Sequence, residues 1–168
     1  MLTDEEILNI IIPPSNIISN FNDFTNDTDE IKELELKAIR LAETKEYEKA
    51  LEIINQAIKL SPKNPSLYNN RAQIFQLQHD IKSAMLDLNK AIDLNGNIDN
   101  NIACQCFTQR GIIYQHDKNL EEAKINYEKA AELGSLFAKN QLIQMNPYSA
   151  LCNQMLRIMT RTNYSTSD

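Results

Sequence analysis

The sequence has few of the residues that nucleotide and metal chemistry require. Its three glycines, Gly96, Gly111 and Gly134, stand singly among 168 residues, so no glycine-rich loop can cradle a phosphate. Three cysteines and two histidines leave little room for a zinc site with four ligands. An odd number of cysteines without a secretory leader also points to a reducing compartment. We therefore expect no metal, no cofactor and reduced thiols.

Long apolar runs and a basic N-terminus are missing as well. The longest apolar run, residues 10–12, is far shorter than the roughly 20 residues of a membrane-spanning helix. The first residues, MLTDEE, are acidic, whereas a secretory signal begins with basic residues. The sequence predicts a soluble, cytoplasmic protein that does not bind membranes.

Basic residues are absent from the first part of the chain. Residues 1–30 contain seven acids and no base, and the remainder contains 16 acids and 17 bases, so the net charge is -6. Nucleic-acid binding normally needs a basic face that neutralises phosphates, and no stretch supplies one. With 42% apolar and 24% charged residues, the composition is that of one soluble globular domain.

A phrase that occurs three times decides the expected fold. Residues 46–62 (EYEKALEIINQAIKLSP) recur as residues 80–96 and again as residues 119–135. Each phrase has a key alanine, then a large side chain four residues later and a second alanine seven residues later, which together form one helix face. The key alanines are Ala50, Ala84 and Ala123, the large residues Ile54, Leu88 and Tyr127, and the second alanines Ala57, Ala91 and Ala130.

A partner helix is expected before each phrase. It carries a small residue twelve positions before the key alanine, at Ala38, Ala72 and Gly111. Small residues on both helices allow the backbones to approach closely, so each unit is predicted to be a helical hairpin, over residues 31–64, 65–98 and 104–135. Asn64 before Pro65, like Asn146 before Pro147, is typical of a capped helix start.

These units resemble the tetratricopeptide repeat (TPR), whose consensus has a small residue in its first helix, alanines in its second and a closing proline such as Pro62. Gly96 and Ser135 replace that proline in the other units, and residues 96–101 lengthen the second junction. The resemblance implies an all-α, TPR-type α-solenoid that binds proteins.

Three segments, YNNRAQ (68–73), QRG (109–111) and residues 130–156, further resemble the tetratricopeptide repeat protein 36 family. Vertebrate members of this family are associated with the Hsp70 chaperone and with control of tyrosine breakdown. The resemblance therefore implies a chaperone-associated cofactor or a regulator of a metabolic enzyme.

The ends of the stack need cover for its exposed apolar faces. Residues 136–161 are predicted to form two capping helices, and residues 162–168 a frayed tail. Residues 1–30 are predicted to be an acidic arm with a short helix over residues 4–12, which either docks on the repeats or forms on meeting a partner. The apolar stripe of the second capping helix is Tyr148, Leu151, Cys152, Met155, Leu156 and Met159.

The first helices of such hairpins line a concave wall, which here is rich in carboxamides. Carboxamides both donate and accept hydrogen bonds, as an extended peptide requires, although a solvated polar face would have the same composition. Lys32, Glu35 and Ile39 are expected on the wall of the first repeat. The predicted partner-binding groove comprises Asn69, Asn70, Gln73, Gln76, Gln105, Thr108, Gln109 and Gln115.

Chaperone adaptors with this fold grip a C-terminal dicarboxylate with two lysines, two asparagines and one arginine. The corresponding positions here hold Glu35, Ile39, Asn70, Gln105 and Gln109. Glu35 would repel a carboxylate, so we expect no dicarboxylate clamp, and an Hsp70 partner would use another surface.

Two arginines occupy equivalent places beside the small residues. Arg71 is expected to pair with Asp87, sixteen residues later, rather than with a ligand, whereas Arg110 faces Asn126 in the third repeat and has no charged partner.

A catalytic alternative would use Cys104, Cys106 or His116. Residues two apart on a helix point about 200° away from each other, so the two thiols cannot easily share an ion. No nucleophile has a base held by a third group. A non-catalytic adaptor is the leading hypothesis, and a ligand-binding protein or enzyme that uses these three residues is the alternative.

Overall fold

The computed structural model describes residues 29–96 and 98–146, together with Tyr148 and Met155. All regular secondary structure in these residues is α-helical, so the predicted fold class is confirmed. The expected short helix over residues 4–12 and the tail 162–168 lie outside the described residues. The helices are α2 (Asp29–Glu43), α3 (Tyr47–Leu60), α4 (Pro65–Leu77), α5 (Ile81–Asn95), α6 (Asn100–His116), α7 (Leu120–Glu132) and α8 (Leu136–Met145).

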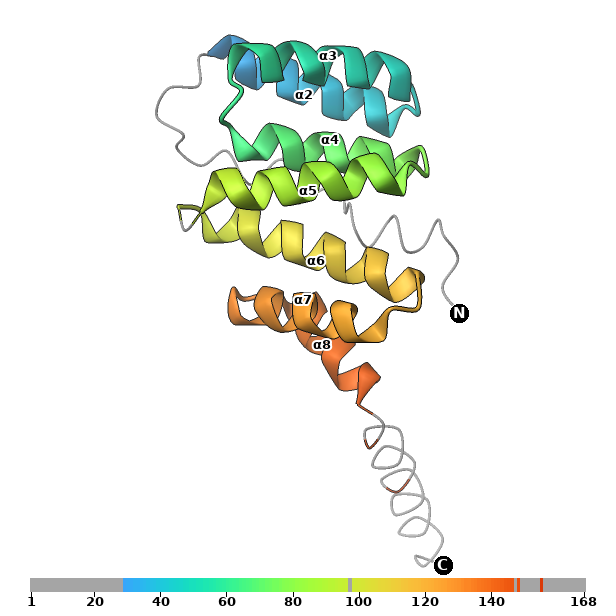
Figure 1. The fold of residues 1–168 in the computed structure, drawn as a ribbon. Helices are drawn as coiled ribbons and strands as arrows, with labels where there is room; N and C mark the ends of the chain where they lie inside the picture. Colours follow the sequence, from blue (N-terminus) through green and yellow to red (C-terminus); the bar gives the residue numbers. More distant parts are fainter. Residues whose placement is uncertain (1–28, 97, 147, 149–154, 156–168) are drawn as a thin grey trace, which may run out of the picture.

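The helices pair in chain order into three hairpins. α2 packs on α3, α4 on α5 and α6 on α7, and α8 packs on α7; Figure 1 shows these pairs stacked one below another. The first helices also contact each other, α2 with α4, α4 with α6 and α6 with α8. The side formed by α2, α4, α6 and α8 is termed the inner face, and the side formed by α3, α5 and α7 the outer face.

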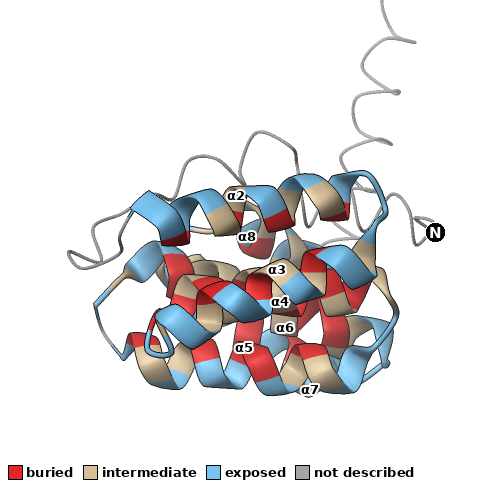
Figure 2. Cartoon of the chain, turned by 90° about the horizontal axis from the view of Figure 1, so that it is seen from above, coloured by how far each residue is buried: buried red, intermediate tan, exposed pale blue. Residues whose placement is uncertain are grey.

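Alanines lie at the centre of each hairpin. Ala50, Ala84 and Ala123 are fully buried, as the repeat predicts. Figure 2 shows buried residues along the surfaces where helices meet. Small residues at these crossings bring the helices together, and the larger residues Ile54, Leu88 and Tyr127 fill the adjacent space, also without exposure.

The turn within each hairpin uses a left-handed residue. Lys45, His79 and Lys118 have φ of 64°, 61° and 61°, and they are spaced along the chain as the key alanines are. The predicted cap at the start of α4 is confirmed, since Asn64 Oδ1 accepts from Ser66 N at 2.9 Å and proline occupies the first turn. The same chain geometry thus recurs in all three repeats.

The lengthened second junction is closed by Asn95, which is fully buried at the end of α5. Its Nδ2 donates to Asp99 O at 2.9 Å, and its Oδ1 accepts from Asp99 N at 3.3 Å. Asp99 in turn caps α6, accepting from Asn101 N at 2.7 Å. α5 and α6 therefore remain packed together despite the extra residues.

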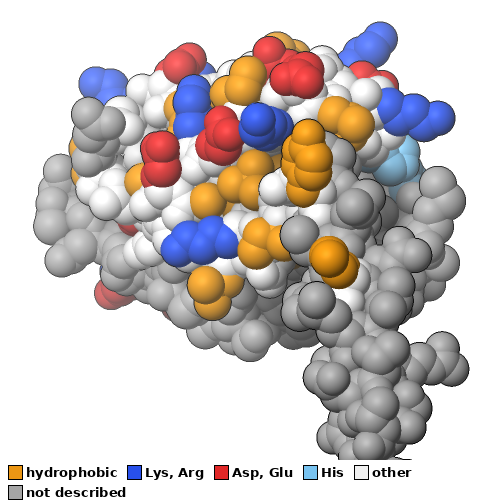
Figure 3. Space-filling view, turned by 90° about the horizontal axis from the view of Figure 1, so that it is seen from below, with side chains coloured by type: hydrophobic (Ala, Val, Ile, Leu, Met, Phe, Trp, Pro, Cys, Tyr) orange, Lys and Arg blue, Asp and Glu red, His pale blue; other side chains and the backbone are white. Residues whose placement is uncertain are grey.

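At the far end of the stack, α8 covers the last hairpin. Ser135 caps this helix by accepting from Ala138 N at 3.1 Å, and Ala138 is fully buried. Tyr148 and Met155, two members of the predicted capping stripe, are 74% and 60% exposed, and the other members lie outside the described residues. Figure 3 views this end, where apolar side chains alternate with charged ones. None of the described helices has the length and apolarity needed to cross a membrane.

Candidate functional site on the inner face

The inner face contains the eight polar residues that the sequence predicts for a binding groove. Asn69, Gln76 and Gln109 have only 2%, 5% and 3% of their surfaces exposed. The expectation that these three line an open wall is therefore wrong, because their side chains bond one another between α4 and α6. The other five predicted residues are half-buried: Asn70, Gln73, Gln105, Thr108 and Gln115.

Four carboxamides hydrogen-bond one another across the second and third repeats. Asn69 Nδ2 donates to Gln105 Oε1 at 3.0 Å, and Gln109 Nε2 donates to Asn69 Oδ1 at 2.9 Å. Gln76 Nε2 donates to Gln109 Oε1 at 2.7 Å. These four residues are termed the amide ladder. A buried polar group without a partner costs about 1–3 kcal/mol, so this mutual pairing allows carboxamides to lie inside a repeat junction.

The remaining predicted residues differ in whether their side chains already form hydrogen bonds within the protein. Thr108 Oγ1 donates to Cys104 O at 2.7 Å. Gln115 Nε2 donates to Gln141 Oε1 at 3.3 Å, and Gln115 Oε1 accepts from the Tyr127 hydroxyl at 2.6 Å. Among the described residues, the Gln73 side chain has no hydrogen-bond partner, so its amide is available for a ligand.

Glu35 lies where a carboxylate clamp would need a lysine. Its Oε1 accepts from Asn70 Nδ2 at 2.6 Å and from Ser66 Oγ at 2.6 Å, and the side chain is buried. The negative charge therefore lies inside the inner face and engages Asn70, the asparagine that remains of the clamp pattern. A second carboxylate at this point would meet both a like charge and an occupied donor.

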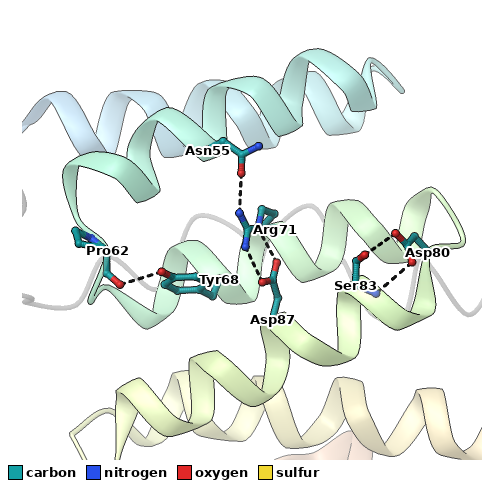
Figure 4. Close-up of polar contacts among 7 residues, drawn as sticks. All are labelled: Asn55, Pro62, Tyr68, Arg71, Asp80, Ser83 and Asp87. Atoms are coloured by element: carbon teal, nitrogen blue, oxygen red, sulfur yellow. Dashed lines mark hydrogen bonds and ion pairs between the residues drawn. The ribbon is translucent and has the colours of Figure 1, made fainter.

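The predicted ion pair between Arg71 and Asp87 is confirmed. Arg71 Nε and Nη2 donate to the two carboxylate oxygens of Asp87, each at 2.7 Å, and Nη1 donates to Asn55 Oδ1 at 2.7 Å. Figure 4 shows the guanidinium of α4 between α3 and α5, on the outer face. Its carbon also lies 5.5 Å and 5.8 Å from the ring centres of Tyr68 and Phe75. Hydrogen bonding to Asp87 raises the pKa of Arg71.

The two cysteines of α6 point to different neighbours, as their spacing predicts. Cys106 Sγ is buried and donates to Asn69 Oδ1 at 3.4 Å, whereas Cys104 Sγ donates to Ala130 O at 3.6 Å. Burial raises the pKa of Cys106 to about 12 and also raises the pKa of Cys104. Both thiols are therefore protonated at neutral pH, which makes them weak nucleophiles and weak metal ligands.

His116 does not join these thiols in one site. It lies twelve residues beyond Cys104 on the same helix, about 18 Å along the axis. Within the described part of the chain, no three side chains of His, Cys, Asp and Glu lie close enough together to hold a metal ion.

Sequence reasoning missed three residues that shape the inner and outer faces. Ser66 supports Glu35, Gln141 supports Gln115, and Asn55 supports Arg71. All three contacts cross between elements, so no local motif marks them. The sequence carries no signal for them, since Arg71 and Gln115 already have a partner within their own repeats, Asp87 and Tyr127.

Comparison with known proteins identifies the family. The pattern described as "TPR repeat" matches residues 40–79, and the "Tetratricopeptide repeat" pattern matches residues 65–98 and 105–133. The chain is 42% identical to the tetratricopeptide repeat protein 36 homolog of Drosophila melanogaster, over 92% of this chain and 90% of that protein. The chain belongs to the tetratricopeptide repeat protein 36 family. It is also 44% identical to the Homo sapiens protein of that name, over 76% of this chain and 67% of the relative.

Solved structures similar to this family member are TPR domains. The first TPR of Spaghetti (RPAP3), bound to the HSP90 peptide SRMEEVD, matches with a TM-score of 0.62 and 25% sequence identity. The match covers 76% of this chain and 99% of that chain. The Sgt2 TPR domain from Aspergillus fumigatus matches with a TM-score of 0.63 and 23% sequence identity. The match covers 79% of this chain and 87% of that chain. The chain is thus a TPR scaffold for protein–protein interaction.

Proposed function

We propose that this member of the tetratricopeptide repeat protein 36 family is a non-catalytic, cytoplasmic adaptor that binds a protein segment on its inner face. The partner is a chaperone of the Hsp70 class, or a metabolic enzyme of tyrosine breakdown that the adaptor regulates. A chaperone would contact the part of the inner face around Gln73 rather than the five clamp positions, so the contact does not use a dicarboxylate clamp. The single observation that carries this proposal is the engagement of Glu35 with Asn70 and Ser66.

The charge at Glu35 separates this chain from TPR domains that bind acidic peptides. A clamp gains affinity from several charge-assisted hydrogen bonds, each worth about 1.5–3 kcal/mol. Glu35 replaces one cation by an anion, and Ile39, Gln105 and Gln109 supply no charge at the other positions. The loss of two or three such bonds amounts to several decades of affinity.

The half-buried amides give a neutral partner a surface to bind. Gln73 on α4 has an unengaged carboxamide among the described residues, and Asn70 lies one turn before it. Such groups pair with peptide N–H and C=O groups without selecting for charge. The preferred partner segment is therefore extended and close to neutral.

Two titrations of the full chain test the proposal. The acidic peptide SRMEEVD should not bind the inner face, so any affinity that it shows should be the same in Asn70→Ala and in the unaltered chain. Purified Hsp70 should bind equally well with or without its acidic C-terminal residues. Gln73→Arg should weaken Hsp70 binding at least tenfold, while Gln56→Arg, a matched change of an exposed residue on α3, should not.

Micromolar peptide binding that disappears in Asn70→Ala would refute the absence of a clamp. Equal binding by Gln73→Arg and the unaltered chain would refute the inner face as the site.

A further inference from the structure

The third repeat contains an arginine whose counterpart in the second repeat is fully engaged. Arg110 follows Arg71 by 39 residues, the same spacing that separates Ala84 from Ala123. In the second repeat, Asp87 accepts two hydrogen bonds from Arg71 and Asn55 accepts a third. This arrangement shows which ligand chemistry such a guanidinium takes on the outer face, namely a carboxylate.

The corresponding acid is missing in the third repeat. Asn126 replaces Asp87, and its Nδ2 donates instead to Glu122 O at 2.8 Å. Arg110 Nε is buried without a hydrogen-bond partner, although the residue as a whole is half-exposed. A charged donor in this state costs free energy, and an anion that engages the rest of the guanidinium would offset it.

A second cation, Lys129, packs on an aromatic ring one helical turn before Arg110. Lys129 Nζ lies over the ring of Phe107, 5.3 Å from its centre, and Phe107 precedes Arg110 by one turn of α6. In the described part of the chain, neither Arg110 nor Lys129 forms an ion pair with an acid. The charge of Arg110 also acts on Cys106, whose pKa is raised by burial and lowered in part by this arginine.

We propose that Arg110 and Lys129, which packs on Phe107 one helical turn before Arg110, form an outer-face site for a carboxylate-rich segment of a partner protein. Arg110 takes the carboxylate that Asp87 supplies to Arg71, and Lys129 takes a neighbouring acid. Charge complementarity selects the partner, since two cations that form no ion pair in the described part of the chain favour clustered Asp and Glu side chains. Arg110 is turned by about 100° around α6 from Gln109, and its counterpart Arg71 lies between α3 and α5, so this site differs from the inner-face site of the proposed function.

A binding experiment with the full chain tests the site. The probe is a fluorescein-labelled hexaglutamate peptide, with hexaglutamine as its uncharged control, measured by fluorescence polarisation at low salt. We expect hexaglutamate to bind and hexaglutamine not to bind, and added salt to weaken binding. Arg110→Gln should lower the affinity at least tenfold, because Arg110 is the central charge of the site. Lys129→Gln should lower it about threefold, because charges at the rim of an interface contribute less to affinity.

Two further variants keep the result independent of folding defects. Asn126→Asp places an acid of the chain itself beside Arg110. It should therefore lower the affinity for hexaglutamate at least tenfold while the protein stays folded. Arg71→Gln removes an equivalent arginine that is already engaged, so affinity should change less than twofold. The proposal is overturned if hexaglutamate does not bind, or if Arg110→Gln and Asn126→Asp bind it as tightly as the unaltered chain.

The competing occupant of this site is the acidic N-terminal segment of the same chain. Residues 1–28 carry five acids and no base, and a tethered segment competes efficiently with a free one. A chain that lacks residues 1–28 should bind hexaglutamate within twofold of the full chain. Tenfold tighter binding after this deletion would assign the site to residues 1–28 and overturn its assignment to a partner. Gln73→Ala, a change on the inner face, should bind hexaglutamate within twofold of the unaltered chain, so failure of this test and failure of the inner-face proposal are distinguishable.

Discussion

The ring of Tyr127 on α7 lies against Gly111 on α6, where an added Cβ would come within 2.6 Å of two ring carbons. The equivalent positions of the other repeats combine alanine with a smaller side chain, Ala38 with Ile54 and Ala72 with Leu88. In the third hairpin, the smaller residue on α6, Gly111, thus makes room for the larger side chain on α7, Tyr127. Tyr127 also uses its hydroxyl, which donates to Gln115 Oε1 at 2.6 Å.

Gly111→Ala should therefore destabilise the protein although alanine favours helices. Alanine gains about 1 kcal/mol of helix propensity over glycine, but overpacking of a tight contact typically costs about 1–3 kcal/mol. We expect a net decrease of up to about 2 kcal/mol in the free energy of unfolding, measured by urea denaturation. Adding Tyr127→Leu recreates the pair of the second repeat, and it should make the alanine substitution neutral or favourable. An equal cost in both backgrounds would show that the ring is not the cause.

The three left-handed turn residues offer a stabilising change. A non-glycine residue in this conformation costs about 1–2 kcal/mol relative to glycine, partly offset by the greater freedom of glycine in the unfolded chain. Lys45→Gly, His79→Gly and Lys118→Gly should each raise the free energy of unfolding by up to about 1 kcal/mol. Because the sites lie in different repeats, the triple variant should show nearly the sum. Lys63→Gly, an exposed turn position without positive φ, should show no gain in melting temperature.

The amide ladder predicts a large effect from a small polar deletion. Asn69→Ala removes the partner of Gln105 Oε1, Gln109 Nε2 and Cys106 Sγ in a buried junction, although Gln109 Oε1 still accepts from Gln76. We expect a loss of about 1–3 kcal/mol in unfolding free energy. Gln73→Ala removes an amide on the same helix that has no hydrogen bond among the described residues, and it should cost less than about 0.5 kcal/mol. Similar losses in the two variants would contradict a structural role for the ladder.

The hairpins could be predicted because their determinants are local and repeated. Ala50, Ala84 and Ala123 recur at nearly constant spacing, and every one is buried as predicted. The Asn64 cap and the Arg71–Asp87 pair also follow from short or fixed separations. Such patterns survive in sequence because one repeat contains both partners.

The packing between repeats could not be predicted in the same way. Asn69 and Gln109 are 40 residues apart, and Glu35 and Asn70 are 35 apart, so their contacts depend on how closely two hairpins stack. A carboxamide alone predicts an exposed position, because its burial is favourable only when a partner of matching geometry is present. The absence of charges at 69, 76 and 109 was the one hint that these positions face another helix rather than water.

Arg71 and Arg110 occupy equivalent places, so removing the acid near Arg71 and adding an acid near Arg110 should change the free energy of unfolding in opposite directions. Asp87→Asn removes the acid from Arg71 and should lower the free energy of unfolding by about 1.5–3 kcal/mol, the usual value for a hydrogen bond to a charged group. Asn126→Asp gives Arg110 an acid at the corresponding place. Because Asn126 is buried and donates to Glu122 O, the new ion pair must offset the desolvation of the carboxylate and the lost hydrogen bond, and the net gain in the free energy of unfolding should not exceed about 1 kcal/mol. Chemical denaturation at neutral pH measures both. Added salt should reduce the gain in Asn126→Asp, and Asn126→Leu, which adds no charge, should show no gain.

The protonated thiols of α6 predict slow alkylation. Cys106 has a pKa of about 12, so at pH 8 only about one molecule in ten thousand carries its thiolate, the form that reacts. Iodoacetamide at pH 8 should modify Cys106 at least a hundredfold more slowly in the folded protein than in urea, with Cys104 reacting at an intermediate rate because it is half-buried. Peptide mass mapping separates the two sites. Because burial raises both pKa values, the folded-state rates should still increase with pH above 9, where the thiol in urea approaches full ionisation. A rate at Cys106 that levels off below pH 9 would mean an activated thiol, and it would revive the catalytic alternative.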